Sequence, residues 1–215
     1  MTTRVRSSGK LQRMGFAVIV RPILHFWVGV RIFGGDNIPD GPPYIIVANH
    51  ASHLDAAIVL ATLPPHRLPE IRPVAAADYF MRNRVLAWVT RTFFNVLPIP
   101  RSDYTSENDP IQLMKGALDE GSALLVFPEG TRITDDASEM QSFRSGVARL
   151  VEYHPDVPFV PMWVEGARRS MPKGTFFPVP VFCEVHIGAP RTVSGSLSEI
   201  LEALERSVRE LREST

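Results

Sequence analysis

Short apolar runs alternate with amphipathic segments along most of the chain. The runs 45–48 and 123–127 are continuously apolar and have the length of buried strands. Further strands are expected at 73–76, 94–101, 157–164 and 179–187. Helices, several of them amphipathic, are expected at 53–63, 77–93, 110–120, 142–154 and 196–213. This alternation predicts an α/β fold: a single domain with a mixed, largely parallel sheet flanked by helices.

The stretch 11–33 is rich in Phe, Ile and Val, with Arg21 and Pro22 at its middle. A central arginine costs about 2.5–3.5 kcal/mol in a spanning helix. The uncharged pieces 14–20 and 22–30 are far shorter than the roughly 20 residues that span a bilayer. We therefore expect a kinked helical pair that lies on or dips into one leaflet, with its arginines at the headgroups. A helix packed on the domain is the alternative.

Gly34 and Gly35 end this stretch, which divides the chain into a membrane-anchoring segment, residues 1–35, and an α/β domain, residues 36–215. Residues 1–33 hold six of the 23 basic residues and no acidic residue, which leaves 17 basic and 23 acidic residues in the remainder. This asymmetry favours attraction to an anionic membrane surface, at the cytoplasmic face. The acidic body argues against binding of nucleic acid.

The first candidate for chemistry is the turn that follows the run 45–48. His50 stands just after that run, and Ser52 and Asp55 have the spacing of a capping box at a helix start. Ligand sites of open α/β sheets gather at this carboxyl edge of the strands. Asp55 can simply cap the helix, or it can accept a hydrogen bond from one ring nitrogen of His50 and leave the other nitrogen as a general base. Both interpretations can hold at once.

The second candidate is the stretch Glu129 to Arg132, which follows the run 123–127. Its glycine allows close backbone approach, its threonine offers a hydroxyl, and its arginine is a planar fork for phosphate. Arg101, at the end of another strand, can supply a second cation. A turn with surface salt bridges is the alternative. Together with a base at His50, the set indicates one site for a phosphorylated alcohol that is deprotonated at its hydroxyl.

Two motifs carry a resemblance to a known family. The stretch Asn49 to Asp55 resembles the NHxxxxD motif of the glycerolipid acyltransferases, the PlsC-like lysophosphatidic acid (1-acylglycerol-3-phosphate) acyltransferase family. The stretch Phe127 to Arg132 resembles that family's FPEGTR motif in full, and His50 and Glu129 lie 79 residues apart in the family's order. Weaker resemblances are Leu97 to Arg101, Phe143 to Gly146, Val160-Pro161 and Met171 to Gly174. Departures from the family's usual residues are Asn95, Pro100, Ile133 and Arg144.

The resemblance implies transfer of a fatty acyl group from acyl-CoA, or from acyl carrier protein, to a hydroxyl of a lysophospholipid-type acceptor. In that scheme His50 takes the hydroxyl proton and Asp55 steadies the imidazolium. No covalent acyl-enzyme and no metal or other cofactor is required, and the chain has no G-x-S-x-G nucleophile elbow. Backbone amides of residues 49–52 are candidates for stabilising the oxyanion.

The same resemblance assigns substrate contacts. It implies that Arg101 and Arg132 hold the phosphate of the acceptor, and that Glu129, Gly130 and Thr131 lie near its glycerol part. An acceptor that resides in a membrane also gives the basic, apolar N-terminal segment a purpose.

Two other function classes remain open on the sequence. One is a metal-dependent hydrolase with His50, His53 and Asp55 as ligands, although metal sites usually draw further ligands from elsewhere in the chain. Cys183 is the only cysteine, which excludes an intramolecular disulfide and a cysteine-rich zinc site. The other is a catalytically silent lipid-binding domain.

Overall fold

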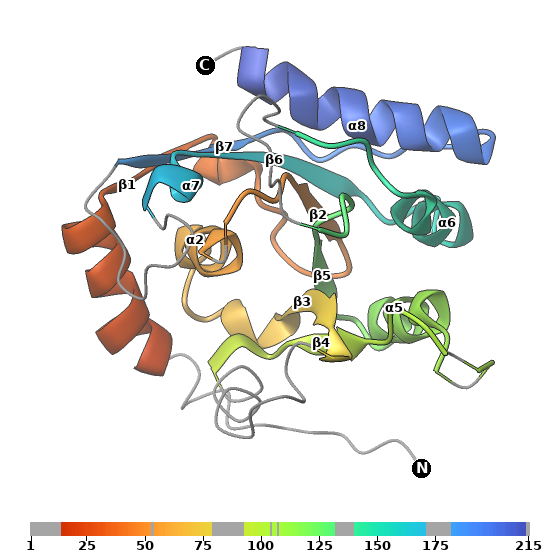
Figure 1. The fold of residues 1–215 in the computed structure, drawn as a ribbon, viewed down its shortest axis with the longest axis horizontal. Coiled ribbons are helices and arrows are strands. Elements are labelled where there is room, and N and C mark those ends of the chain that lie inside the picture. The colour runs from red at the N-terminus through yellow and green to blue at the C-terminus, as the bar shows by residue number, and fades with distance from the viewer. Residues whose placement is uncertain are drawn as a thin grey trace.

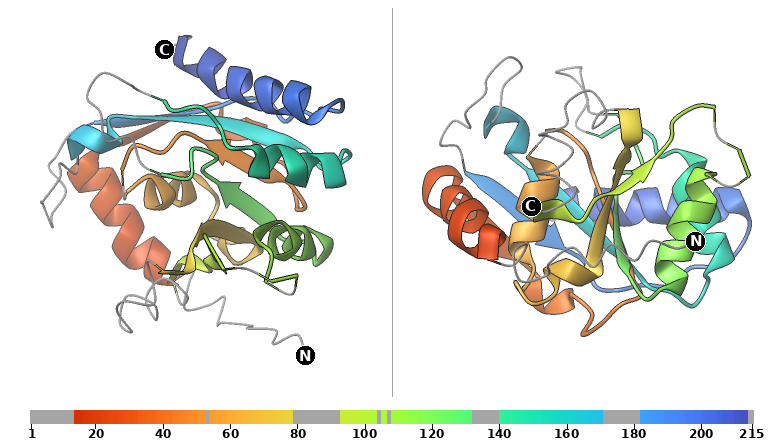
Figure 2. Two further views of the ribbon diagram at one scale, coloured as in Figure 1. Left: turned by 45° about the vertical axis from the view of Figure 1, so that its right-hand side comes forward. Right: turned by 90° about the horizontal axis from the view of Figure 1, so that it is seen from below.

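A computed structural model describes residues 14–52, 54–78, 93–103, 105–106, 108–131, 140–170 and 182–213. In this part of the chain, seven strands form one sheet with helices on both faces (Figures 1 and 2). The strand order is β1-β7-β6-β2-β5-β3-β4. The strands are β1 (Val30–Phe33), β2 (Ile45–Ala48), β3 (Ile71–Ala76), β4 (Leu97–Ile99), β5 (Ala123–Val126), β6 (Phe159–Glu165) and β7 (Cys183–Ile187).

The sheet is mixed and largely parallel, as predicted. The strands β6, β2, β5, β3 and β4 all run in one direction. Of the seven strands described, β7, antiparallel to β6, and β1, parallel to β7, run the other way. The carboxyl ends of the five co-directional strands therefore share one edge of the sheet, and the turn at His50, the turn at Glu129 and Arg101 all follow strands that end there.

Helices cover the two faces of the sheet unequally. The helix α2 (Asp55–Thr62) and the helical residues 14–28 lie on one face. The helices α5 (Pro110–Asp119), α6 (Ser145–Tyr153) and α8 (Leu197–Glu213) lie on the other. The shorter helices are η3 (Gly35–Asn37), η4 (Leu68–Glu70) and α7 (Ala167–Ser170). Alternate β2 residues enter the two cores, Ile46 and Ala48 on the α2 side, Ile45 and Val47 on the α8 side.

Capping residues explain where the surface helices begin. The Asp109 side chain accepts hydrogen bonds from the N–H groups of Ile111 and Gln112 at the start of α5, which begins at Pro110, the predicted first residue of this helix. Ser196 and Glu199 form a reciprocal capping box at the start of α8. The predicted helix 53–63 begins only at Asp55, because the preceding turn is held by side-chain hydrogen bonds.

The N-terminal helix, defined as residues 14–28, differs from the prediction. Two π-helical stretches, η1 (Phe16–Val20) and η2 (Ile23–Val28), are joined by Arg21 and Pro22. The helix ends at Gly29, whose φ of 71° is left-handed. The expectation of helix up to residue 33 is therefore wrong, because the chain turns at Gly29 and its next four residues pair with β7 as β1.

One side of the N-terminal helix belongs to the domain core. Phe16, Leu24 and Val28 are buried against the residues of α2 and the sheet. Arg21 Nε donates a hydrogen bond of 3.1 Å to the carbonyl oxygen of Ala61, in the last turn of α2. The predicted boundary between residues 35 and 36 therefore does not separate two cores.

The other side of the N-terminal helix is apolar and exposed. Its exposed large hydrophobic residues are Met14, Val18, Ile19, Ile23 and Phe26, the last with 89% of its surface accessible. Among the described residues, no helix is long and apolar enough to cross a bilayer. Several predicted features lie outside the described residues: His53, Arg132, the turn 171–174 and most of the helix 77–93.

Candidate active site

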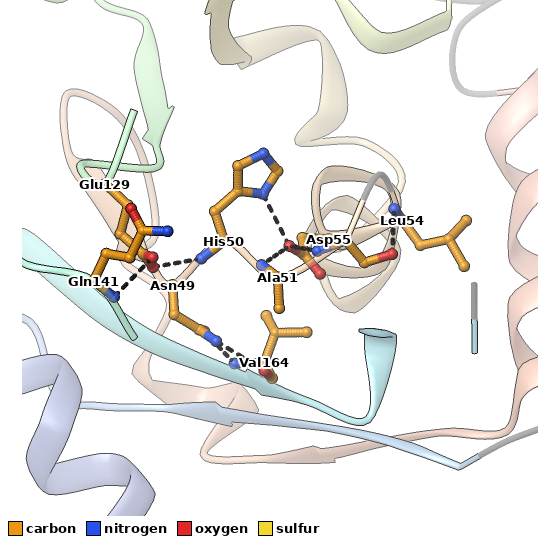
Figure 3. A network of polar contacts seen from close by, with 9 residues as sticks. Asn49, His50, Ala51, Leu54, Asp55, Glu129, Gln141 and Val164 are labelled. Carbon is orange, nitrogen blue, oxygen red and sulfur yellow. Dashed lines mark hydrogen bonds and ion pairs between the residues drawn. The ribbon is translucent and has the colours of Figure 1, made fainter. Parts of the chain in front are cut away.

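Asn49 fixes the point at which β2 ends and the His50 turn begins. Its side chain is almost fully buried, and it bonds to the backbone of Val164 in β6. Asn49 Nδ2 donates to the Val164 carbonyl oxygen (3.0 Å), and the Val164 N–H donates to Asn49 Oδ1 (2.7 Å) (Figure 3). The side-chain amide thus replaces a peptide group and extends the β2–β6 pairing beyond Ala48 and Met162.

Asp55 holds both the turn and the imidazole. Its side chain is fully buried, and Oδ2 lies 2.9 Å from His50 Nδ1. The same oxygen accepts hydrogen bonds of 2.7 Å from the N–H groups of Ala51 and Ser52. A carboxylate oxygen accepts, so His50 Nδ1 donates, and in the neutral ring Nε2 then keeps its lone pair. Both predicted contacts of Asp55, with the helix start and with His50, are therefore present.

The His50 ring stands away from this backbone network, with Nδ1 toward Asp55 (Figure 3). Its side chain is 23% exposed. Phe127, which follows β5, stacks on it with ring centroids 4.5 Å apart and planes inclined by 25°. The nearby Asp55 and the distant Phe127 therefore both contact the imidazole and fix its plane, and the ring nitrogen bonded to Asp55 is Nδ1.

Glu129 is turned inward rather than toward a ligand. It is 2% exposed, its Oε1 accepts the N–H of His50 (2.8 Å), and its Oε2 accepts the N–H of Gln141 (3.0 Å) (Figure 3). Burial raises the pKa of the Glu129 carboxyl, although the two backbone N–H groups act in the opposite direction. The expected contact between Glu129 and the acceptor's glycerol part does not fit this geometry, because both carboxylate oxygens have internal partners.

The turn after Glu129 requires a glycine. Gly130 has a φ of 71°, and a Cβ built there would lie 2.8 Å from Nε of Arg144 and 2.9 Å from its Cδ. Arg144 Nε also donates to the Glu129 carbonyl oxygen (3.2 Å). Thr131 is exposed, and its hydroxyl lies 3.4 Å from Gln141 Oε1. The arginine thus occupies the space that a side chain at position 130 would need.

Comparison with known proteins agrees with these two turns. The family model described as Acyltransferase matches residues 29–165, most of the chain and all of both turns. The chain belongs to this acyltransferase family. It is 26% identical to the chloroplastic 1-acyl-sn-glycerol-3-phosphate acyltransferase BAT2 of Brassica napus, over 71% of this chain and 44% of that protein. It is 25% identical to the mouse 1-acyl-sn-glycerol-3-phosphate acyltransferase alpha, over 86% of this chain and 62% of that protein.

A solved structure supports the fold assignment of this family member. The crystal structure of the 1-acyl-sn-glycerophosphate (LPA) acyltransferase PlsC from Thermotoga maritima superposes with a TM-score of 0.68. The match covers 95% of this chain and 78% of the Thermotoga chain, at 23% identity. The chain spans about two fifths of the length of two related plant enzymes: 44% of the Brassica protein and 38% of the chloroplastic 1-acyl-sn-glycerol-3-phosphate acyltransferase LPAT1 of Arabidopsis thaliana.

Arg101 of this acyltransferase-family chain lies at the predicted edge but apart from His50. Three strand spacings separate β4 from β2, which is about 14 Å. The Arg101 side chain is 58% exposed, and its Nε lies 3.9 Å from Oδ1 of Asp78, itself 63% exposed. Such a pair contributes little to stability, so this guanidinium is available to an anionic ligand.

The predicted oxyanion donors are occupied. The N–H of His50 donates to Glu129, and those of Ala51 and Ser52 donate to Asp55. Three of the four amides suggested by the sequence are therefore already bonded to carboxylates. Capping-box spacing predicted the Ser52 contact, but the Glu129 contact joins residues 79 apart and has no local sequence pattern.

The metal-hydrolase alternative receives no support from the family assignment. In the described part of the chain, no group of three or more His, Cys, Asp or Glu side chains is arranged to hold a metal ion. His50 Nδ1 is bonded to Asp55, and the third suggested ligand, His53, lies outside the described residues.

Proposed function

We propose that this protein transfers a fatty acyl group from acyl-CoA, or from acyl carrier protein, to the hydroxyl of a lysophospholipid such as 1-acylglycerol-3-phosphate. The observation that carries the proposal is the His50–Asp55 pair, 2.9 Å apart at the carboxyl edge of the sheet, with Nε2 turned away from the network. The names of the related plant and mouse enzymes support the choice of acceptor.

The chemistry follows from the orientation of His50. Nε2 accepts the hydroxyl proton while the acceptor oxygen attacks the thioester carbonyl. The carbon–oxygen bond forms, the carbon–sulfur bond breaks, and the imidazolium returns its proton to the departing thiolate. The buried Asp55 carboxylate stabilises the imidazolium between these two transfers. No acyl-enzyme forms, so donor and acceptor must be bound at the same time.

The acceptor phosphate is assigned to Arg101 and Arg132. Arg101 supports this assignment because it is exposed at the same sheet edge as His50. The assignment of Arg132 rests on its place in the sequence, directly after the exposed Thr131. Gly130 and Thr131 lie beside the glycerol part in this arrangement, whereas the Glu129 carboxylate faces inward.

The membrane is the proposed location of the acceptor. The N-terminal helix offers an exposed apolar side that includes Ile19, Ile23 and Phe26. Its opposite side is fixed in the domain core, which suits a helix lying in the plane of the interface. We assign this side, together with the basic residues of the segment 1–35, to contact with anionic lipids at the cytoplasmic face.

The test is a transfer assay with the purified full chain. A panel of acyl-CoA and acyl carrier protein donors is combined with 1-acylglycerol-3-phosphate and with unphosphorylated monoacylglycerol, and products are identified by mass spectrometry. The expected result is diacylglycerol phosphate, reduced about 10²- to 10⁴-fold by His50→Ala. His66→Ala, an exposed histidine outside both turns, is the matched control. A silent lipid-binding domain would bind the acceptor and yield no product with any donor.

A further inference from the structure

The His50 turn presents three consecutive backbone N–H groups, and the protein fills all of them with its own carboxylates. Asp55 takes those of Ala51 and Ser52, and Glu129 takes that of His50. Consecutive N–H groups at such a turn form a concavity that suits anions. Here the anions come from two separate parts of the chain, so the turn depends on Glu129 as well as on its own helix.

Glu129 is also the link between three backbone segments. Its Oε1 bonds to the residue that follows Asn49 at the end of β2, and its Oε2 bonds to the N–H of Gln141, which precedes α6. Its own backbone belongs to the turn after β5, where its carbonyl oxygen accepts from Arg144 Nε. One buried side chain thus sets the spacing between the His50 turn and the chain on either side of the segment 132–139.

Phe127 and Glu129 act on the same residue from the same turn. Phe127 stacks on the His50 ring at 4.5 Å, while Glu129 bonds to the His50 backbone. Asp55 supplies the third contact, at Nδ1. Glu129 therefore holds the His50 backbone, Phe127 the plane of the ring and Asp55 its rotation. Removal of any one of these three contacts would let His50 move in the corresponding way.

We propose that Glu129 is a positioning residue for His50 and not a ligand of the acceptor. The inference rests on the proposed function, since it assigns Glu129 a part in the same reaction. To reach an acceptor hydroxyl, the buried carboxylate would have to give up a backbone hydrogen bond, at a cost of about 1–3 kcal/mol for each buried N–H left unpaired.

Electrostatics adds a second reason to keep a carboxylate at this position. Burial disfavours the charged form of Glu129 and raises its pKa, while the proximity of His50 lowers it. An ionised Glu129 carboxylate is a negative charge near the ring that becomes an imidazolium during transfer, and opposite charges attract. Glu129 therefore acts on His50 through both geometry and charge, without contact with the reacting atoms.

The decisive variants are Glu129→Gln and Glu129→Asp. The Gln amide accepts one N–H and turns its own NH₂ toward the other, whereas Asp keeps the charge but withdraws both oxygens by one methylene. Glu205→Gln is the matched control, because Glu205 Oε2 accepts the N–H of Phe143, two residues after Gln141, and does not touch His50. All are compared with the wild-type full chain for kcat, for the acceptor KM, and for thermal midpoint.

We expect Glu129→Gln and Glu129→Asp to lower kcat about 10- to 100-fold, the size of effect that a misplacement of about 1 Å produces. The acceptor KM, measured with the lysophosphatidic acid substrate, should stay within about threefold of wild type, because no acceptor contact is lost. Glu205→Gln should leave kcat unchanged. An acceptor KM raised more than tenfold with kcat retained, or wild-type kcat in Glu129→Asp, would overturn the proposal.

A readout independent of turnover completes the test. Nitrogen-15 spectra of labelled histidine report which ring nitrogen of His50 carries the proton, with His50→Gln used for assignment. Glu129→Gln should broaden or mix the single Nδ1–H form, and an unchanged spectrum would contradict positioning. If wild type shows no transfer but Glu129→Gln still disturbs this spectrum, the proposed function fails and the positioning role stands.

Discussion

Asp55→Asn separates the charge of Asp55 from its geometry. In the described part of the chain, Oδ2 has three donors while the buried Oδ1 has no partner. An asparagine can therefore place its oxygen where Oδ2 lies and its NH₂ where Oδ1 lies. The turn at His50 should keep its backbone hydrogen bonds, and only the negative charge beside the imidazole is lost.

The structure gives the size of the effect. For opposite unit charges 2.9 Å apart, an effective dielectric constant of about 20 gives about 6 kcal/mol, equivalent to about 10⁴-fold in rate. The imidazole carries only part of that charge in the transition state, so we expect kcat to fall about 10²- to 10⁴-fold. The new NH₂ lacks a partner, which costs about 1–3 kcal/mol and lowers the thermal midpoint by about 2–12 °C.

The assay is initial-rate release of free CoA thiol at a temperature well below the variant's midpoint. Asp119→Asn is the control, because Asp119 also lies beside a histidine, with Oδ1 3.6 Å from His154 Nε2, but joins α5 to the end of α6. That control should keep its kcat. Folded Asp55→Asn with kcat within twofold of wild type would refute the assigned role of the carboxylate, and so would an equal loss in the control.

Three further outcomes are expected. Arg101→Ala should raise the KM for the phosphorylated acceptor about tenfold or more and leave the KM for acyl-CoA unchanged, because Arg101 is assigned to the acceptor phosphate. Steady-state kinetics with unphosphorylated monoacylglycerol give the comparison. An equal loss of activity with both acceptors contradicts the assignment. Burial raises the pKa of Glu129 above its ordinary value of 4.5, so the folded protein binds the carboxyl proton more tightly than the unfolded chain does. The contribution of Glu129 to the free energy of unfolding therefore falls as the pH rises from about 4.5 through the raised pKa. Urea unfolding across this range should show a shallower decline in Glu129→Gln, and parallel curves would exclude the effect. Phe26→Ser should weaken co-sedimentation with anionic vesicles severalfold, because Phe26 lies on the exposed apolar side of the N-terminal helix. Tyr153→Ser, at an exposed aromatic residue of α6, should leave co-sedimentation unchanged. Equal binding of both variants speaks against the assigned lipid contact.

The residue-substitution test of the membrane contact is preferable to deletion. Removal of residues 1–33 would take Phe16, Leu24 and Val28 out of the core and remove β1 from the sheet. Loss of vesicle binding could then reflect unfolding instead of a missing lipid contact. Phe26 is exposed, so its replacement leaves the packed side of the helix intact.

Local pattern was sufficient for the two central strands that lead into the candidate site, β2 and β5. The apolar runs at 45–48 and 123–126 are strands because residues buried on both faces must be apolar throughout. The strand β1 was missed because it follows an apolar helix without a polar break, and only Gly29 marks the change. Its pairing with β7 joins residues far apart in sequence, which no local pattern encodes.

The candidate site divides in the same way. The contact between His50 and Asp55 was predictable because one turn contains both residues and capping-box spacing brings the carboxylate back. The inward orientation of Glu129 was not predictable from the sequence. Its partners are backbone N–H groups, which every residue type except proline carries, so no residue pattern marks them. A sequence motif identifies a functional residue, but it does not show whether the side chain faces the substrate or the protein interior.

The shared core of the N-terminal helix and α2 has a mechanical consequence. Phe16 and Leu24 pack in the same cluster as Ile58 and Leu60 of α2, and Arg21 is bonded to the last turn of that helix. A membrane surface that bound the exposed side of the N-terminal helix would therefore fix the orientation of the whole domain, which a flexible linker would not do. The height of His50 above such a surface would then be set by packing and not by linker length.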